Sequence, residues 1–293
     1  MSRTTSLGKA AVRLVCATFG ISRQAYYAVG RDRPQQATPA PRARAWATAE
    51  QLVEAIKAIV QAHPGWGVRK VWAVLRRQGL VASHKRVWAE MHRLGLTLPP
   101  VAERREEAAR GHVTVADSNR RWATDLTTVW TRRDGVVALV PVIDCGDRFA
   151  LACAVTKSQE APSVLAPVGS SLWREFHRPE HVPDGLELRS DHGPQYTGAD
   201  CAELCTRWRL DHTLAPVGRP TGNAVAERFI LTLKLELIWT RDWESAAELD
   251  EAVHPWLDTY NHQRPHQALN WQTPAERRAA NLDNRTAAAL AAS

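Results

Sequence analysis

The stretch RRWATDLTTVWTRRDGVVALVPVIDCGDRFALACAVT, residues 120–156, decides the fold, because it contains three runs rich in β-branched and aromatic residues joined by two short turns. The turns are Arg133-Asp134-Gly135 and Cys145-Gly146-Asp147. Runs that follow one another this closely pair as antiparallel neighbours. The stretch therefore predicts a three-stranded antiparallel meander, with an aspartate inside its first strand.

The segment after this meander alternates between helical and strand patterns. A helix is expected over residues 159–176, a strand over 186–190, a second helix over 199–208 and a last strand over 211–214. Strands joined through a helix run parallel. Three antiparallel strands followed by two crossover strands predict a ribonuclease H-like α/β fold, which is a mixed five-stranded sheet flanked by helices.

Three carboxylates occupy positions that such a fold can bring together. Asp125 lies in the first strand, Asp191 ends the fourth strand, and Glu227 lies in the helical pattern GNAVAERFILTLKLELI. Clustered carboxylates raise one another's pKa, so a cluster of ionised ones indicates a divalent cation, Mg²⁺ with Mn²⁺ as a substitute. Two such ions serve in-line phosphoryl displacement. The spacing alone also fits three unrelated residues among the 31 Asp and Glu of the chain.

Charge is divided unevenly along the 293 residues. Residues 1–110 contain 19 Lys and Arg against 7 Asp and Glu, whereas the chain as a whole has a net charge of +7. A basic N-terminal part predicts salt-sensitive binding to a polyanion such as DNA. A solvated basic surface is the alternative that charge alone leaves open.

The pattern divides the chain into five parts. Residues 1–47 are expected to form a helical segment and a linker, 48–98 a helix-turn-helix, 99–118 a second linker, 119–278 the catalytic core with its C-terminal helix, and 279–293 an Ala-rich tail. In the helix-turn-helix, the second helix begins at Ser83 and has basic residues beside an apolar stripe. The expected DNA contacts in this region are Arg69, Lys70, Arg76, Arg77, His84, Lys85 and Arg86. A helical pair that only packs on the next domain is the alternative.

The remaining composition is that of a cytoplasmic protein. The chain has no apolar run long enough for a membrane span and no signal-peptide pattern. Its five cysteines contain no CxxC pair, so reduced thiols are expected; Cys201 and Cys205 are spaced as two metal ligands on a helix, but no second pair is evident. Five tryptophans lie in apolar patterns that suit a core: Trp122, Trp130, Trp173, Trp208 and Trp256.

Several sequence motifs, in their order along the chain, resemble the motifs of one known family. They are HPGWGVRKVWAVLRRQGLVASHKRVWAEMHRLGL (63–96), RRWATDLTTV (120–129), VIDCGDRFAL (142–151), RSDHGPQYTG (189–198), NAVAERFILTLKLEL (223–237) and YNHQRPHQALNWQTPAE (260–276), with 35 residues between the second carboxylate and the third. The chain resembles the OrfB-type transposase of the IS-three family of bacterial insertion sequences, a relative of retroviral integrases, over nearly its whole length.

The resemblance implies a DDE transposase in which Asp125, Asp191 and Glu227 are catalytic and bind two Mg²⁺. It also implies cleavage at the terminal repeats of the element, strand transfer into target DNA, a homo-oligomer and an upstream-frame OrfA protein as partner or fusion. A catalytically silent DNA-binding regulator is the alternative, and a nuclease without strand transfer is a third hypothesis that the basic helix-turn-helix disfavours.

Two residues near Glu227 share its helix face. Asn223 lies four residues before it and Lys234 seven residues after it. Lys234 is expected to bind a DNA phosphate, with a solvated lysine as the alternative, whereas Asn223 is favoured as an N-cap over a role in ordering the loop. Arg264 and His266 are compatible either with DNA contact or with packing on the core.

Overall fold

The computed structural model describes residues 46–99, 115–216 and 222–292. All of them belong to one unit, Trp46–Ser293. The helical segment expected within residues 1–47 and most of the linker expected at 99–118 lie outside the described residues. Among the described helices, none is long and apolar enough to cross a membrane.

Three helices occupy the positions that the sequence predicts for the helix-turn-helix. They are α3 (Ala49–Ala62), α4 (Val68–Arg77) and α5 (His84–Arg93). A capping box opens α3, in which Thr48 and Gln51 each accept a hydrogen bond from the other's backbone N–H. At the start of α5, Ser83 Oγ accepts from the backbone N–H of Arg86 at 3.2 Å. Gly79 has a φ of 84° in the intervening turn, which a residue with a side chain rarely adopts.

This helical region has a core of its own. Each helix contributes fully buried apolar residues at three- or four-residue spacing, which are Leu52, Ile56, Val71, Leu75, Val87 and Met91. The indole N–H of Trp72 donates to the Ala82 carbonyl oxygen at 3.0 Å and holds α4 against the turn that precedes α5. The apolar stripes that the sequence predicts therefore face inward.

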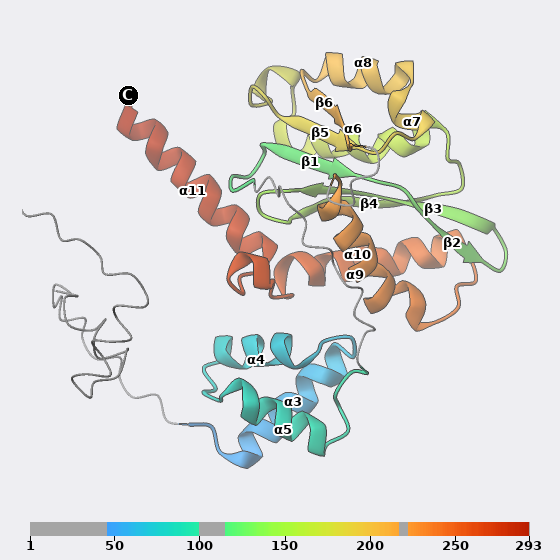
Figure 1. The fold of residues 1–293 in the computed structure, drawn as a ribbon. Coiled ribbons are helices and arrows are strands. Elements are labelled where there is room, and N and C mark those ends of the chain that lie inside the picture. The colour runs from blue at the N-terminus through green and yellow to red at the C-terminus, as the bar shows by residue number, and fades with distance from the viewer. Residues whose placement is uncertain (1–45, 100–114, 217–221, 293) are drawn as a thin grey trace, which may run out of the picture. The chain divides into compact units, whose positions relative to one another are not determined.

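A mixed sheet forms the centre of the larger part of the unit (Figure 1). Its strands are β1 (Arg121–Thr124), β2 (Thr127–Thr131), β3 (Gly135–Asp144), β4 (Ala150–Thr156), β5 (Glu187–Ser190) and β6 (Asp211–Leu214). β3 pairs antiparallel with β4 and with both β1 and β2, whereas β5 pairs parallel with β1 and with β6. The predicted meander and the two predicted crossover strands are thus confirmed.

The first predicted strand is interrupted at Asp125 and Leu126. β1 ends with Thr124 paired to Val142, and β2 continues along β3 in the same register three residues later. In the gap, the backbone N–H of Leu126 donates to Asp125 Oδ1 at 2.8 Å. The sheet keeps the five strand positions that the sequence predicts, and the first position is occupied by β1 and β2 together.

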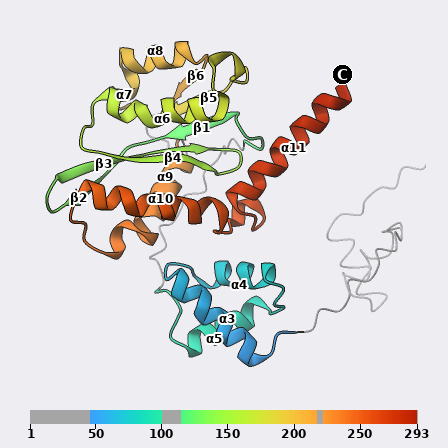
Figure 2. The ribbon, with the colours of Figure 1, turned by 180° about the vertical axis from the view of Figure 1, so that it is seen from behind.

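Helices cover both faces of this sheet (Figures 1 and 2). One face is covered by α6 (Ala161–Phe176), α7 (Pro194–Thr197) and α8 (Ala199–Arg207), and the other by α9 (Ala224–Glu236) and α10 (Ala246–His262). Each face has a separate apolar core. Because β3 is buried on both sides, it is an almost continuous apolar run rather than an alternating one. Short 3₁₀ turns at Pro179–His181, Ile238–Thr240 and Gln267–Leu269 complete the connections.

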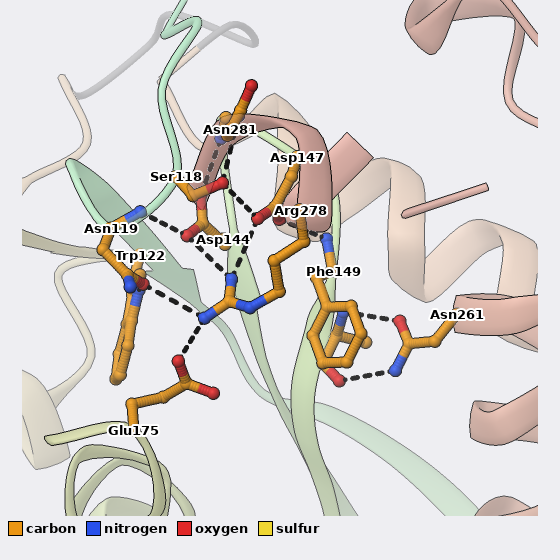
Figure 3. Close-up of polar contacts among 12 residues, drawn as sticks. Ser118, Asn119, Trp122, Asp144, Asp147, Phe149, Glu175, Asn261, Arg278 and Asn281 are labelled. Atoms are coloured by element: carbon orange, nitrogen blue, oxygen red, sulfur yellow. Dashed lines mark hydrogen bonds and ion pairs between the residues drawn. The ribbon is translucent and has the colours of Figure 1, made fainter. Parts of the chain in front are cut away.

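The last helix, α11 (Pro274–Ala292), is attached to the sheet through buried charge (Figure 3). Arg278 donates to Asp144, the last residue of β3, at 3.3 Å and to Asp147, on the turn that follows, at 2.9 Å, and it also contacts Glu175 near the end of α6. The boundary expected after residue 278 falls inside this helix. Its first turns therefore pack as part of the core domain.

The five tryptophans expected in the core divide into two groups. Trp122 and Trp208 are buried and Trp256 is half-buried, but Trp130 is 62% exposed and Trp173 61% exposed. The core prediction is therefore wrong for these two. Trp130 points outward because successive side chains of β2 alternate between buried and exposed, and Trp173 lies on the outer face of α6.

Candidate functional site

Asp125 and Asp191 lie at matching ends of two neighbouring parallel strands. β1 pairs with β5 so that Ala123 lies opposite Arg189. The same register, continued by two residues, places Asp125 opposite Asp191. Adjacent strands are about 4.8 Å apart, so the pairing brings together two carboxylates that are far apart in the sequence. Both side chains are half-buried.

Glu227 lies in the first turn of α9, and Asn223 fixes where that helix begins. Asn223 is buried, and its Nδ2 donates to the carbonyl oxygen of Thr124 at 2.9 Å. It occupies the N-cap position that the sequence favours, yet its side chain makes no capping hydrogen bond. Because Thr124 precedes Asp125, this contact holds the start of α9 beside the first carboxylate.

The turn after Asp191 is closed by local hydrogen bonds. The backbone N–H of Gly193 donates to Asp191 Oδ1 at 3.0 Å, and His192 Nε2 lies 2.8 Å from the carbonyl oxygen of Ala215. Tyr196 on α7 is buried, and its hydroxyl lies 3.3 Å from Thr124 Oγ1. The two aspartate-bearing strand ends are thereby linked through Tyr196.

The three carboxylates influence one another electrostatically. Burial raises the pKa of Asp125 to about 6; the Leu126 N–H opposes this shift, the charges of Asp191 and Glu227 add to it, and Lys234 lowers it. Partial desolvation also raises the pKa of Glu227. A nearby divalent cation would favour the ionised form of all three groups. The site therefore combines mutually repelling acids with a lysine on the same helix as the glutamate.

The donor set of this site suits a hard divalent cation. Magnesium and manganese bind carboxylate oxygens, and three carboxylates from two strand ends and one helix offer such oxygens without a soft ligand. Within the described ranges, the group of three ligands whose atoms all lie within 4.8 Å of one another is Cys201, Cys205 and His212.

The basic residues expected on α4 are largely engaged with other parts of the unit. Lys70 Nζ lies 2.6 Å from Glu236 Oε1, and Arg69 Nη1 donates to Gln267 Oε1 at 3.4 Å. Arg77 behaves similarly, because it forms an ion pair with Glu276, whereas the guanidinium of Arg76 lies 4.8 Å from the ring centroid of Trp72 on α4 itself. These contacts orient α4. Three of the four α4 residues that were expected to contact DNA therefore pack against the core domain.

The basic residues expected on α5 lie near its N-terminus. His84 and Lys85 are exposed and Arg86 is half-exposed. Farther along the same helix, Trp88 is 50% exposed and its ring stacks on His92 with centroids 5.2 Å apart. The first turn of α5 thus offers positive charge next to an exposed aromatic side chain.

Arg264 and His266 pack inside the unit. Arg264 Nη2 donates to Glu236 Oε1 at 2.9 Å, and the His266 ring meets the Tyr260 ring edge-on at 4.8 Å. Burial lowers the pKa of His266 to about 2, and the charges of Arg264 and Lys70 contribute to the shift. Of the two alternatives that the sequence leaves open for this pair, the structure contains the packing one.

Two groups around the site were not found from the sequence. Tyr196 was not singled out, and Arg189, which precedes Asp191 by two residues, donates from Nη1 to the Gly222 carbonyl oxygen at 3.2 Å. Both residues lie in the motif RSDHGPQYTG, residues 189–198, which is one of the motifs that carry the family resemblance. Membership in that motif is the sequence feature that could have identified them. Their partners, Thr124 and Gly222, become neighbours only when the sheet and α9 are assembled.

Family models match both parts of the chain. An HTH-like domain matches residues 48–105, and two models of an integrase core domain match residues 116–220 and 194–274. Similar curated proteins include a transposase for insertion sequence element IS904 from Lactococcus lactis, which is 26% identical over 78% of this chain and 93% of its own length. Another is transposase InsD for insertion element IS2 from Escherichia coli, which is 28% identical over 73% of either chain.

Solved structures with a similar arrangement include two viral ones. A chain of the simian T-cell lymphotropic virus intasome in complex with PP2A regulatory subunit B56 gamma is 16% identical, with a TM-score of 0.46 over 76% of this chain and 74% of its own. The catalytic core domain of BIV integrase is 20% identical, with a TM-score of 0.42 over 57% of this chain and 99% of its own.

Proposed function

We propose that this chain, which belongs to the insertion-sequence transposases with an integrase core domain, cleaves DNA at the ends of its element and joins the cut strand to a target. The observation that carries the proposal is the meeting of three carboxylates from separate elements. Asp125 and Asp191 are in register at the ends of β1 and β5, and Glu227 begins α9 beside them. A polynucleotidyl transfer reaction needs such a site and a means of holding DNA next to it.

Asp125, Asp191 and Glu227 would hold a divalent cation. We assign two Mg²⁺, with Mn²⁺ as a substitute, which when bound activate the attacking oxygen and stabilise the leaving oxygen of the phosphodiester. The residues of the chain hold the carboxylates in position. Asn223 holds α9 against β1, and the Gly193 N–H orients the Asp191 carboxylate.

DNA binding is assigned mainly to the first turn of α5. His84, Lys85 and Arg86 present positive charge there, and the N-terminal residues of a recognition helix are the ones that reach base edges and phosphates. Lys234 lies on α9 seven residues after Glu227, and its charge lowers the pKa of Asp125, which supports a role for it next to the carboxylates. Its ammonium group is suited to bind the phosphate next to the scissile bond.

The catalytic test uses charge-neutral substitutions of the triad. Asp125→Asn, Asp191→Asn and Glu227→Gln should each abolish cleavage and joining of element-end DNA in Mg²⁺, because each removes an anionic ligand while keeping the side-chain shape. Products are measured on denaturing gels with end-labelled DNA. Asp184→Asn is the matched control, since Asp184 makes only an exposed ion pair with Arg209 at 3.4 Å.

The result that would overturn the assignment is equal product formation by wild type and all three variants. Binding of the same DNA, measured in parallel, separates chemistry from recognition. If the wild type binds element ends but yields no product in Mg²⁺ or Mn²⁺, either alone or with purified OrfA, the chain is the silent DNA-binding regulator instead.

Assembly is the remaining part of the proposal. The resemblance to insertion-sequence transposases implies a homo-oligomer on DNA and an upstream-frame OrfA protein as partner or fusion, and we propose both. The same cleavage assay with and without purified OrfA, followed by light scattering of the DNA complex, tests both points. A monomeric complex with full joining activity would contradict the oligomer.

A further inference from the structure

We propose that Cys201 and Cys205 on α8 and His212 on β6 form a binding site for a soft divalent cation, with Zn²⁺ as the expected ion. The two cysteines are spaced by one helical turn, so both thiols face the same side of α8. The sequence offers them as two possible ligands with no visible third. The structure adds His212, because β6 follows α8 and returns beneath it.

The three ligand atoms already lie close together. All of them fall within 4.8 Å of one another, and Cys201 Sγ lies 4.0 Å from His212 Nε2. In a tetrahedral zinc site with Zn–S near 2.3 Å and Zn–N near 2.0 Å, a sulfur and a nitrogen are about 3.5 Å apart. A shift of about half an ångström in side chains would therefore be sufficient for this pair to share one ion.

The chemistry of the ligands selects the ion. Two thiolates and one imidazole form a soft donor set that favours zinc over magnesium, and two thiolates balance its two positive charges. Both cysteines are buried, at 0% and 5% exposure, so the site is shielded from solvent as structural zinc sites are. It is distinct in chemistry from the carboxylate site, which offers only oxygen.

Ser190 is the candidate for the fourth coordination position. Ser190 Oγ is buried and lies 3.0 Å from His212 Nε2, and it also donates to the carbonyl oxygen of Asp191 at 3.2 Å. This hydroxyl can occupy the fourth position or hold a water that does. A metal here would tie α8, β6 and the end of β5 together. Its effect would therefore be to fix the strand end that carries Asp191.

The same three side chains have a simpler interpretation. Cys201 and Cys205 belong to the apolar core under α6 and α8, and cysteines often fill such positions as small hydrophobic residues. That interpretation predicts no bound metal. An imidazole nitrogen within 4.8 Å of both thiols, with the Ser190 hydroxyl beside that imidazole, is what favours a ligand set over simple packing.

The test is a metal measurement on purified full-length protein under reducing conditions. After incubation with Zn²⁺ and removal of excess ion, the wild type should retain one zinc per chain by elemental analysis. With Co²⁺ in place of Zn²⁺, it should show thiolate-to-cobalt charge-transfer absorption in the near ultraviolet. Cys201→Ser, Cys205→Ser and His212→Asn should each lose the bound zinc and the cobalt signal. Zinc should raise the melting temperature of the wild type and leave those of the variants unchanged.

Two control variants make the outcome specific. Cys153→Ser removes another buried cysteine, on β4, and should retain the metal. The combined variant Asp125→Asn, Asp191→Asn, Glu227→Gln should also retain one zinc, which separates this site from the proposed catalytic one. Wild-type protein that holds less than a tenth of an equivalent of zinc and shows no cobalt–thiolate absorption would overturn the proposal. The measurement needs no DNA and no catalysis, so it is independent of the proposed activity.

Discussion

At the scale of single residues, Arg278 shows how much of this fold depends on one guanidinium. It faces Asp144 and Asp147, both completely buried (Figure 3). Burial raises the pKa of Asp144 to about 7 and the charge of Asp147 adds to the shift, whereas the backbone N–H groups of Asn119 and Gly146 and the guanidinium oppose it. Without the Arg278 guanidinium, the carboxyl groups of Asp144 and Asp147 would share a site that is closed to solvent.

Removing that cation should be strongly destabilising. Arg278→Met should lower the free energy of unfolding by about 3 to 5 kcal/mol, because it leaves buried carboxylates without their charged partner. Chemical denaturation followed by tryptophan fluorescence measures the change. Arg209→Met removes an exposed ion pair and should cost about 0 to 1 kcal/mol. Equal losses in the two variants would show that Arg278 is not the attachment of α11.

The residues that could be predicted from the sequence are those whose chemistry is visible without a partner. Asp125, Asp191 and Glu227 lie in recognisable sequence motifs. The hydrogen bond from Asn223 to the Thr124 carbonyl oxygen, by contrast, cannot be predicted from the sequence of either segment. A side chain that bonds to a distant backbone group has no sequence pattern of its own. The same holds for the meeting of His212 with the α8 thiols.

At the scale of elements, hydrophobic pattern and turn residues were sufficient for most helices and strands. The strand order follows from the antiparallel turns and the helical crossovers. The break at Asp125 could not be seen, because the register and the apolar pattern continue across it. The outward side chain of Trp130 was missed because a large apolar residue was expected to be buried, although one face of β2 remains in solvent.

The contact between α4 and α9 is an element-scale feature with two possible roles for its lysine. Lys70 was expected to bind DNA, and in the structure its ammonium group lies against Glu236, whose side chain is 9% exposed and also accepts from Arg264. Glu236 lies at the end of the helix that begins near Glu227. A lysine used in this way attaches α4 to the core domain.

A matched pair of lysine variants separates the two roles. Lys70→Met should lower the free energy of unfolding by about 1 to 2 kcal/mol, since Glu236 loses a charged donor, and should leave the salt dependence of DNA affinity unchanged. Lys85→Met on α5 should leave stability unchanged and reduce the salt slope by about 1. Denaturation curves and binding titrations at several salt concentrations measure both. A reduced salt slope for Lys70→Met would instead return Lys70 to the DNA interface.

At the scale of the whole molecule, buried ionisable groups give opposite contributions to stability as the pH changes. The pKa of Asp144 is about 7 in the folded protein against an ordinary value of 3.8. Between these two pH values the native state keeps a proton that the unfolded state releases, so Asp144 stabilises the protein increasingly as the pH falls from 7 toward 3.8. Glu236, whose pKa is lowered chiefly by Arg264 and Lys70 against the effect of burial, contributes stability above its ordinary value of 4.5 and loses it as the pH falls below. The net pH profile is therefore not readable from one group.

His266 can be isolated from these opposing terms by comparison with a variant. Its folded pKa is about 2 against an ordinary value of 6.5, so below pH 6.5 the unfolded state takes up a proton that the native state excludes, and stability falls with the pH.

His266→Asn removes this term and leaves those of Asp144 and Glu236 in both proteins. The difference in unfolding free energy between variant and wild type should therefore shift in favour of the variant by up to about 1.4 kcal/mol per pH unit from pH 6.5 downward. Denaturation at half-unit intervals between pH 7.5 and 5, each value set by buffer, spans about 1.5 units below pH 6.5, so the expected total shift is about 2 kcal/mol. His254→Asn, at an exposed histidine on α10, is the control substitution of the same kind. Parallel curves for His266→Asn and the wild type would mean that the pKa of His266 is the same in the folded and unfolded states, which would contradict its burial beside Arg264.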